Sequence, residues 1–567
     1  MPIIISLAFF VMFLVPIFYL YYGAYLFGNG GIDFSVFSKE ITPLVNTIET
    51  GLGAAIIATS LGATYAWIVA RTDVPGKRVL SAIPLLALTM PLLTKGFGWI
   101  FLFAPRNGLV NAWIMQLFHL SSAPFDIYGM WGIIFATGLG GMPLAFLIMK
   151  PALDSFDSSL EETSRVVGNS PFRTFTRVTL PGILPALASV FVLLFIDAMS
   201  LLDYAVLLGE PVRYSTLATE VDYWAQEAVP PNYGFAGTIG IEYIVITLAL
   251  VTFYVWLTRK SFSYSVITGK SSRETVNKLR KWKIPAFLVC VSIFTFVFIL
   301  PLATLVFISF TKTYTFINGA VIATYSLVNW TEAISMNLIW QALLNSILFA
   351  AAGGILATVI GLFLSLGFLK SRVRGARYLE FISYLPFVIP GIVYGLALFW
   401  TFLFLPGISN VLYGTLWPMV IAVTFVYLPK SVRLISSNLV QVAPELDESP
   451  RVVGLGWWRT LWKVVIPLVK GGLVNSFLYV FIDSIRELGA VILLTTSGTV
   501  VFDVLLLSLW QNDTGTLGLV SAASVIATIF IAGVLVVAEI VNPSKKRSTI
   551  TQTRKQEVAN PVPDTMD

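Results

Sequence analysis

The sequence has few charged residues and almost no side chains that favour disulfides or transition metals. Of its 567 residues only 12% are charged, whereas 57% are hydrophobic. A soluble chain is usually about one quarter charged, so too few charges remain to cover a water-facing surface. One cysteine, Cys290, excludes an internal disulfide, and one histidine, His119, excludes a histidine-based metal site. We therefore expect an integral membrane protein that carries no cofactor or metal of its own.

Long apolar runs predict an all-α polytopic membrane protein with about twelve spanning helices, since a span needs roughly 20 apolar residues. The first run lacks a basic segment before it and a clear cleavage site after it, so we interpret it as a retained helix. The expected spans cover about 3–27, 45–70, 79–104, 128–149, 182–208, 234–258, 283–309, 341–369, 378–404, 413–429, 468–494 and 516–541.

The basic residues are sorted by side of the membrane. Lysines and arginines gather in the loops 71–78, 259–283 and 370–377 and in the C-terminal tail, whereas the opposite loops hold few. Because cytoplasmic loops carry the excess of Lys and Arg, both termini are expected in the cytoplasm of a bacterial cell. The net charge of +6 therefore indicates orientation in a lipid membrane, and we expect no nucleic-acid partner.

The chain contains an internal repeat. Residues 162–181 (ETSRVVGNSPFRTFTRVTLP) and 448–467 (ESPRVVGLGWWRTLWKVVIP) are identical at 9 of 20 positions, with a constant offset of 286. The same offset relates Asp197 to Asp483, and an offset of 299 relates Asn46, Gly76 and Pro91 to Asn345, Gly375 and Pro390. We therefore expect two parallel six-helix halves with a path between them.

The repeat also predicts the domain organisation. The expected first half covers 1–258 and the expected second half covers 284–541, joined by a basic cytoplasmic linker at 259–283 and followed by a polar tail at 542–567. Within each half the repeated segment lies in the largest cytoplasmic loop, at about 150–181 and 430–467.

Each repeated segment has the composition of a short helix, a turn and the start of a membrane helix. Acidic residues at its beginning favour a helix N-terminus. Gly168 and Gly454 are typical of a helix end or a sharp turn, and Pro181 and Pro467 of the first turn of the next helix. A simple connecting loop would explain the turn residues but not the shared pattern.

These segments resemble the cytoplasmic motif of permease subunits of bacterial binding-protein-dependent ABC importers of the type I fold. The family pattern is Glu-Ala-Ala, three residues, Gly, nine residues, Ile, one residue, Leu-Pro. Both copies keep its Glu-to-Pro spacing, although Thr163-Ser164 and Ser449-Pro450 replace the two alanines. The fused two-half form and the segment Phe481–Leu488 are most similar to the ferric-iron importer branch.

The resemblance implies that each motif forms a coupling helix that docks on a cytoplasmic ATPase. One chain would bind two ATPase copies, and a separate extracytoplasmic binding protein would deliver the substrate. The residues expected to act in this coupling are Glu162, Arg165, Gly168, Pro181, Glu448, Arg451, Gly454 and Pro467. The chain itself is not expected to be an enzyme, because Thr268-Gly269-Lys270-Ser271 lacks the first glycine of a nucleotide-binding loop.

Ionisable residues inside the expected spans are candidates for the path, because buried charge at membrane depth is costly. The candidates are Lys95, Asp197, Asp483, Arg486 and Glu487. An alternative is that they form interhelical pairs that hold the two halves together. A cationic wall would suit an anion or a chelated metal, and carboxylates would suit a cation.

The expected substrate is ferric iron. The same architecture serves importers of thiamine, phosphonate, sugar phosphate and polyamine, which stay open as alternatives. A gradient-driven secondary transporter also has two parallel halves but would not need the duplicated cytoplasmic motif. A membrane-embedded enzyme would need a cluster of catalytic polar groups, which the sequence does not indicate.

Overall fold

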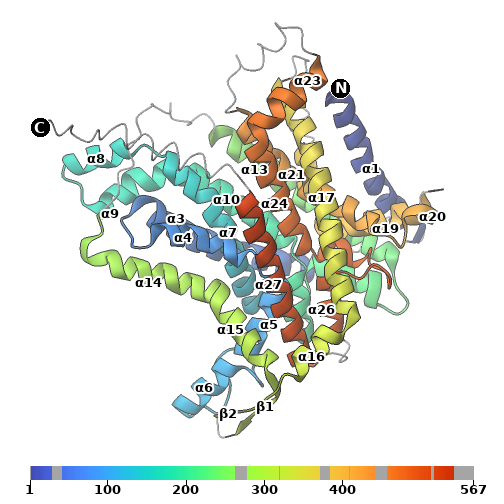
Figure 1. The fold of residues 1–567 in the computed structure, drawn as a ribbon, viewed down its shortest axis with the longest axis horizontal. Coiled ribbons are helices and arrows are strands. Elements are labelled where there is room, and N and C mark those ends of the chain that lie inside the picture. Colours follow the sequence, from blue (N-terminus) through green and yellow to red (C-terminus); the bar gives the residue numbers. More distant parts are fainter. Residues whose placement is uncertain are drawn as a thin grey trace, which may run out of the picture.

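The computed structural model describes residues 2–27, 41–261, 278–317, 320–370, 383–405, 407, 409–440, 456–511 and 516–541. Helices dominate this part of the chain (Figure 1). Ten of them are long and apolar enough to cross a membrane, and the bent pair α4–α5 would make an eleventh. The predicted count of twelve is therefore met only in part, whereas the helical, membrane-spanning class is confirmed.

The first half runs from α1 to α13. Its elements are α1 (Pro2–Phe27), α3 (Ile41–Arg71), α4 (Lys77–Ala87), α5 (Leu92–Phe103), α6 (Leu109–Phe118), α7 (Met130–Ser155), α8 (Ser158–Val166), α9 (Pro171–Thr174), η1 (Phe175–Thr179), α10 (Leu180–Met199), α11 (Asp203–Gly209), η2 (Glu210–Val212), α12 (Leu217–Asp222), η3 (Tyr223–Glu227) and α13 (Tyr233–Ser261).

The second half runs from η5 to α27. Its elements are η5 (Arg280–Trp282), α14 (Lys283–Phe294), η6 (Thr295–Ile299), α15 (Leu300–Ser309), β1 (Thr311–Ile317), β2 (Ala320–Tyr325), α16 (Val328–Ser335), α17 (Asn337–Lys370), η7 (Leu385–Val388), α19 (Gly391–Phe404), α20 (Ser409–Leu412), α21 (Trp417–Val440), α23 (Trp457–Thr460), η8 (Leu461–Val465), α24 (Ile466–Ile485), α25 (Gly489–Ile492), α26 (Phe502–Gln511) and α27 (Leu517–Val541).

The two halves are built alike. Helix α3 packs against α7 and α10 in the first half, and α17 packs against α21 and α24 in the second. Asn46 donates a side-chain hydrogen bond of 2.8 Å to the carbonyl of Ser215, and its counterpart Asn345 donates one of 2.9 Å to Val500. The repeat found in the sequence is therefore present at the level of single hydrogen bonds.

The first helices cross between the halves. Helix α1 packs against α13 of its own half and α19 of the other, and α15 packs against α27 and α5 in the same way. Glycines permit these crossings: a Cβ atom on Gly98 of α5 would lie 2.7–2.8 Å from atoms of Pro301 on α15. Small residues of this kind let membrane helices approach closely.

Within the described residues four predicted spans are interrupted, among them 378–404, in which η7 ends at Val388 and α19 begins at Gly391. The expected span 79–104 consists of α4 and α5, which meet at an angle of 96°. The expected spans 182–208 and 468–494 end early, because α10 stops at Met199 and α24 at Ile485, and the short helices α11 and α25 follow. Pro91, Ser200 and Arg486 stand at these breaks, with apolar runs on either side, so hydropathy averaged over a whole span could not locate them.

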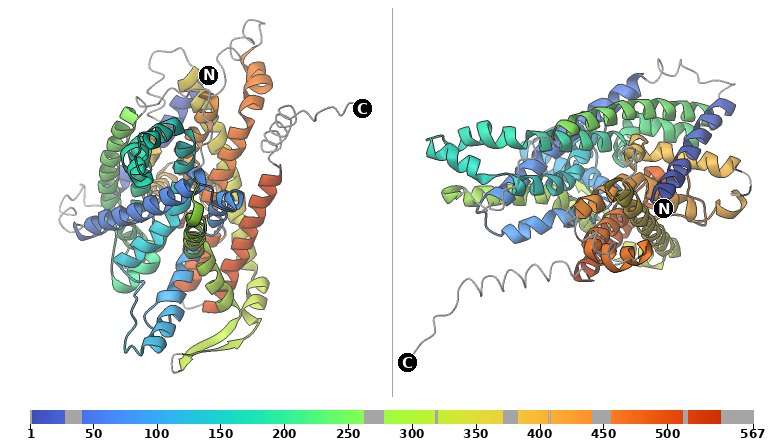
Figure 2. Two further views of the ribbon diagram at one scale, coloured as in Figure 1. Left: turned by 90° about the vertical axis from the view of Figure 1, so that its left-hand side faces the viewer. Right: turned by 90° about the horizontal axis from the view of Figure 1, so that it is seen from above.

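A two-stranded antiparallel hairpin is the exception to the predicted all-α class. Strands β1 and β2 place Tyr314 opposite Ala323 and Thr315 opposite Ile322. The hairpin projects from the molecule beside α6, at the end opposite α8 and α23 (Figures 1 and 2). We call these two ends the hairpin face and, because it carries the predicted coupling segments, the coupling face.

Candidate functional site

A cavity lies between the two halves, where the interrupted helices end. Both halves contribute to its wall: α3, α7, α10 and the α4–α5 bend from the first, and η7, α21, α24 and the segment after α24 from the second. Its ionisable lining residues are Asp197, Asp203, Asp483, Glu487, Lys430 and Arg486, joined by Tyr204, Tyr427 and Tyr479. The cavity therefore concentrates charge at a depth where charge is costly.

At the break between α4 and α5, backbone carbonyls accept hydrogen bonds from basic side chains. Pro91 and its counterpart Pro390 precede α5 and α19 with nearly the same backbone angles, φ −54° and ψ 152° against φ −57° and ψ 146°. At the end of α4, the ammonium of Lys95 donates to the carbonyl of Ala87 at 2.7 Å, and Arg486 donates to that of Leu88 at 3.0 Å. Cations suit this position because the C-terminal end of a helix carries partial negative charge.

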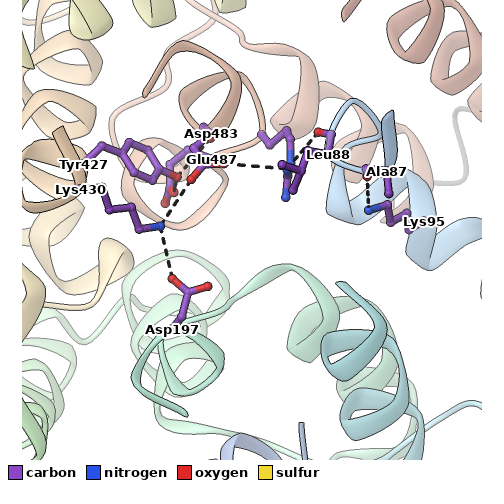
Figure 3. A network of polar contacts seen from close by, with 9 residues as sticks. Ala87, Leu88, Lys95, Asp197, Tyr427, Lys430, Asp483 and Glu487 are labelled. Atoms are coloured by element: carbon purple, nitrogen blue, oxygen red, sulfur yellow. Dashed lines mark hydrogen bonds and ion pairs between the residues drawn. The ribbon is translucent and has the colours of Figure 1, made fainter. Parts of the chain in front are cut away.

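Lys430 lies between the two repeat-related aspartates (Figure 3). Its Nζ atom is 3.4 Å from Asp483 Oδ2 in its own half and 3.5 Å from Asp197 Oδ1 in the first half. On the other side of Asp483, Arg486 Nη1 is 3.9 Å from Oδ1. Asp483 thus faces two cations, and both of them also contact the first half, Lys430 at Asp197 and Arg486 at Leu88.

Glu487 is held in place by its own half. Its Oε1 atom accepts a hydrogen bond of 2.9 Å from the backbone N–H of Ala490, and its Oε2 accepts one of 2.5 Å from the hydroxyl of Tyr427. Tyr427 also lies 3.1 Å from the carbonyl oxygen of Asp483. These contacts fix the chain just after α24, where the cavity wall is not helical.

Four of the five predicted path residues line the cavity: Asp197, Asp483, Arg486 and Glu487. Lys95 is not among the lining residues described; it is 1% exposed and bonded to the end of α4. The sequence analysis missed Lys430, because the expected span ended at residue 429 and the lysine counted as a loop charge. The repeat holds the signal that identifies it, since Pro143 and Pro429 also differ by 286 and place Lys430 opposite Leu144.

The first repeated loop forms the predicted short helix, α8. Gly168 follows it with φ +87°, and the N–H of Asn169 bonds the carbonyl of Ser164 at 3.1 Å. This is the six-to-one bond of a Schellman helix end, which favours glycine at the left-handed position. Gly168 therefore ends a helix, as its position in the sequence indicated.

Side chains tie α8 to the helix that follows. The hydroxyl of Thr179 donates to Glu161 Oε1 at 2.7 Å, and the hydroxyls of Ser164 and Thr174 lie 3.0 Å apart. Glu161 is buried, whereas Glu162, the acid singled out from the sequence, is exposed. The buried carboxylate of this loop is thus one position earlier than the motif suggests. Arg165 lies within α8.

Both repeats enter the next helix through a π turn. Turns η1 (Phe175–Thr179) and η8 (Leu461–Val465) occupy equivalent positions, and each ends two residues before a proline, Pro181 or Pro467. A proline ring clashes with the carbonyl four residues earlier in a regular helix, and a wider turn relieves that clash. Three further predicted coupling residues, Glu448, Arg451 and Gly454, lie outside the described residues.

A separate acidic group lies between α11 and α13. Carboxylate oxygens of Glu210, Asp222 and Glu227 come within 4.8 Å of one another. Burial raises the pKa of the Asp222 carboxyl to about 7, an effect that the charge of Glu227 reinforces. Gln226 donates a hydrogen bond of 2.6 Å to Asp222 Oδ1 and opposes this shift.

Comparison with known proteins places this architecture in a family. Two stretches, residues 75–262 and 357–547, match the family described as binding-protein-dependent transport system inner membrane component. A putative ferric transport system permease protein of Haemophilus influenzae is 27% identical over 481 residues, which cover 82% of this chain and 72% of the relative. A ferric transport system permease protein of Actinobacillus pleuropneumoniae is 26% identical, covering 82% and 65%.

Half-length relatives also match. A probable sulfate transport system permease protein of Nephroselmis olivacea is 26% identical over 211 residues, which cover 37% of this chain and 72% of the relative. The two family matches together span more than half of the chain, one in each half of the structure. The chain therefore belongs to the binding-protein-dependent transport system inner membrane components, as a multi-pass permease subunit with two fused halves.

Proposed function

We propose that the chain forms the translocation path of an ATP-driven importer of ferric iron. The observation that carries this proposal is the cavity between the halves, which the repeat-related carboxylates Asp197 and Asp483 line together. A path between two parallel repeats has its substrate site where interrupted helices meet, and the breaks after α4, α10 and α24 lie at this cavity.

The charges of the cavity favour a cation as cargo. Four carboxylates line it against two basic side chains, and both bases contact Asp483. A free anion would therefore find the basic groups already engaged by carboxylates. Hard cations prefer oxygen ligands, and the full-length relatives are named as ferric permeases. Phosphonate and sugar phosphate fit this wall poorly, whereas thiamine and polyamines are cationic alternatives.

Helix α8 and the second copy of the repeated segment, at 448–467, would dock two copies of a cytoplasmic ATPase. The tip of α8 exposes an apolar pair, Val166 at 87% and Val167 at 76%. The hydrogen bonds from Thr179 and between Ser164 and Thr174 connect α8 to η1 and α9, which continue into α10. Movement of an ATPase bound at the tip would therefore reach Asp197 through one continuous helix.

This assignment sets the orientation in the bacterial inner membrane. The coupling face would lie in the cytoplasm, both chain termini are proposed to lie on that side of the membrane, and the hairpin face would receive the substrate from an extracytoplasmic binding protein. The excess of lysine and arginine in the loops 71–78, 259–283 and 370–377 supports this orientation.

Reconstitution tests the proposal. The full-length chain is co-expressed with its cognate ATPase, purified and placed in liposomes, and the binding protein loaded with radioactive ferric iron is added. We expect two ATPase copies per chain and iron uptake that requires ATP. Uptake by the chain alone, driven by an ion gradient, would favour a secondary transporter. ATP-dependent uptake of thiamine or spermidine, without iron uptake, would show that the substrate is not ferric iron but would still support an ATP-driven importer.

A further inference from the structure

Lys430 connects the two halves through their equivalent aspartates. Its ammonium lies 3.4 Å from Asp483 Oδ2 and 3.5 Å from Asp197 Oδ1. The lysine side chain is only 14% exposed, as is that of Asp483, whereas that of Asp197 is 40% exposed. The contact within the second half is thus enclosed, and the contact to the first half opens onto the cavity.

The second half holds the lysine firmly. Its ammonium lies 5.1 Å from the ring centre of Tyr427 and 5.7 Å from that of Tyr479, both residues of its own half. Aromatic faces attract a cation at such distances. If the two halves move apart, the lysine therefore stays with Asp483 and the aromatic rings, and the contact with Asp197 breaks.

The repeat makes this lysine asymmetric. The equivalent position in the first half is Leu144, which lines the same cavity. The aspartates are duplicated but the cation is not, so a single ammonium serves both carboxylates. Without that ammonium, two negative charges would face each other across the interface and repel.

We propose that Lys430 is a latch between the halves of the permease, closed in this structure through Asp197 and opened when the halves separate during transport. Its place in the transport cycle rests on the proposed function, whereas its effect on the two halves does not. The latch joins charges at the far ends of α10 and α24, the two helices that begin at the coupling motifs. Motion at the coupling face therefore pulls directly on it.

A distance measurement between the halves tests the latch. Leu184 on α10 and Leu468 on α24 are 53% and 47% exposed, and each is replaced by a spin-labelled cysteine in a chain that carries Cys290→Ser. Pulsed electron paramagnetic resonance on the full-length chain in lipid nanodiscs then gives the distance distribution. We expect Lys430→Met to lower the population at the wild-type distance at least twofold, and Lys430→Arg to preserve it.

Matched variants make the test specific. Leu144→Met alters the equivalent position without a charge and should leave the distribution unchanged. Asp197→Asn should also shift the distribution, though less than Lys430→Met because it leaves no facing pair of carboxylates, and the double variant should shift no further than Lys430→Met, because both changes break one contact. An unchanged distribution in both Lys430→Met and Asp197→Asn, or shifts that add, would overturn the latch. The distance is measured on the permease alone. Failure of the wild-type permease to bind an ATPase would therefore count against the proposed function and not against the latch.

Discussion

Arg486, which directly follows α24 in the second half, donates a 3.0 Å hydrogen bond to the carbonyl of Leu88 in the α4–α5 bend of the first half. The same guanidinium lies 3.9 Å from Asp483 Oδ1. The C-terminal end of α4 in the first half is therefore capped by Arg486 of the second half. Arg486 is in turn held by Asp483 of its own half. The bend and the interface thus depend on each other.

Replacing Arg486 tests this dependence. The Arg486→Met variant leaves the Leu88 carbonyl without its charged donor in a site where the arginine side chain is 9% exposed. Hydrogen bonds that involve a charged group contribute about 1.5–3 kcal/mol, so we expect a loss of that size in the free energy of unfolding by SDS. Arg486→Lys, which keeps the charge, should lose less. Equal stability of the Met variant and the wild type would contradict the capping role.

Gly168 tests the helix end of the first coupling loop. The Gly168→Val variant forces a β-branched residue to φ +87°, which costs about 1–2 kcal/mol and should displace α8. We expect ATP-driven uptake to fall at least tenfold and less ATPase to co-purify. Gly456→Val is the matched control, because Gly456 has φ −63° and no atom would lie within 4 Å of its Cβ. Normal uptake by Gly168→Val would exclude the proposed role of this turn.

The repeat in the sequence predicted much of the fold, because equivalent residues make equivalent contacts. Pro91 and Pro390 each precede a helix that follows a break, and Asn46 and Asn345 make matching hydrogen bonds. Four charged residues that were expected within the membrane do line one cavity. The cost of burying charge therefore indicated the site without any knowledge of its shape.

Other features were outside the reach of hydropathy. The break after Met199 lies at Ser200, between two runs of mostly apolar residues, so hydropathy averaged over a span gave no sign of it. Lys430 follows an apolar run and has the composition of a loop boundary, although α21 continues to Val440. The hairpin did have a local signal, since residues 318–319 are Asn-Gly between two strands rich in β-branched and aromatic residues. This signal is independent of the long apolar runs that predict membrane helices.

Close packing between α5 and α15 should be sensitive to size. A Cβ atom at Gly98 would lie 2.8 Å from backbone atoms of Pro301. The Gly98→Val variant therefore forces α5 of the first half away from α15 of the second half. Overpacking of this kind typically costs about 1–3 kcal/mol, measured as the free energy of unfolding by SDS. Gly533→Val on α27, where no atom lies within 4 Å of the added Cβ, should be neutral. Equal effects of the two variants would argue against a specific contact.

The acidic group around Asp222 should make stability depend on pH. The pKa of the Asp222 carboxyl is raised by burial from 3.8 to about 7 in the folded chain, so between these values the folded chain keeps a proton that the unfolded chain loses. Stability should therefore fall as pH rises from about 4 to about 7. Asp222→Asn should flatten the pH dependence of Tm between about pH 4 and 7, and an unchanged slope would show that other groups cause it.

Val166 provides the most direct test of ATPase docking. Its side chain is 87% exposed at the end of α8, and a docked ATPase would cover it. Val166→Asp would place a carboxylate in that interface, where burial of an unpaired charge is unfavourable, so we expect at least tenfold weaker binding of the ATPase with the permease still folded. Val411→Asp is the matched control, since Val411 is 68% exposed on α20, away from the coupling loops. If both variants bind the ATPase as the wild type does, α8 is not its docking helix, and the coupling motif has to act through another surface.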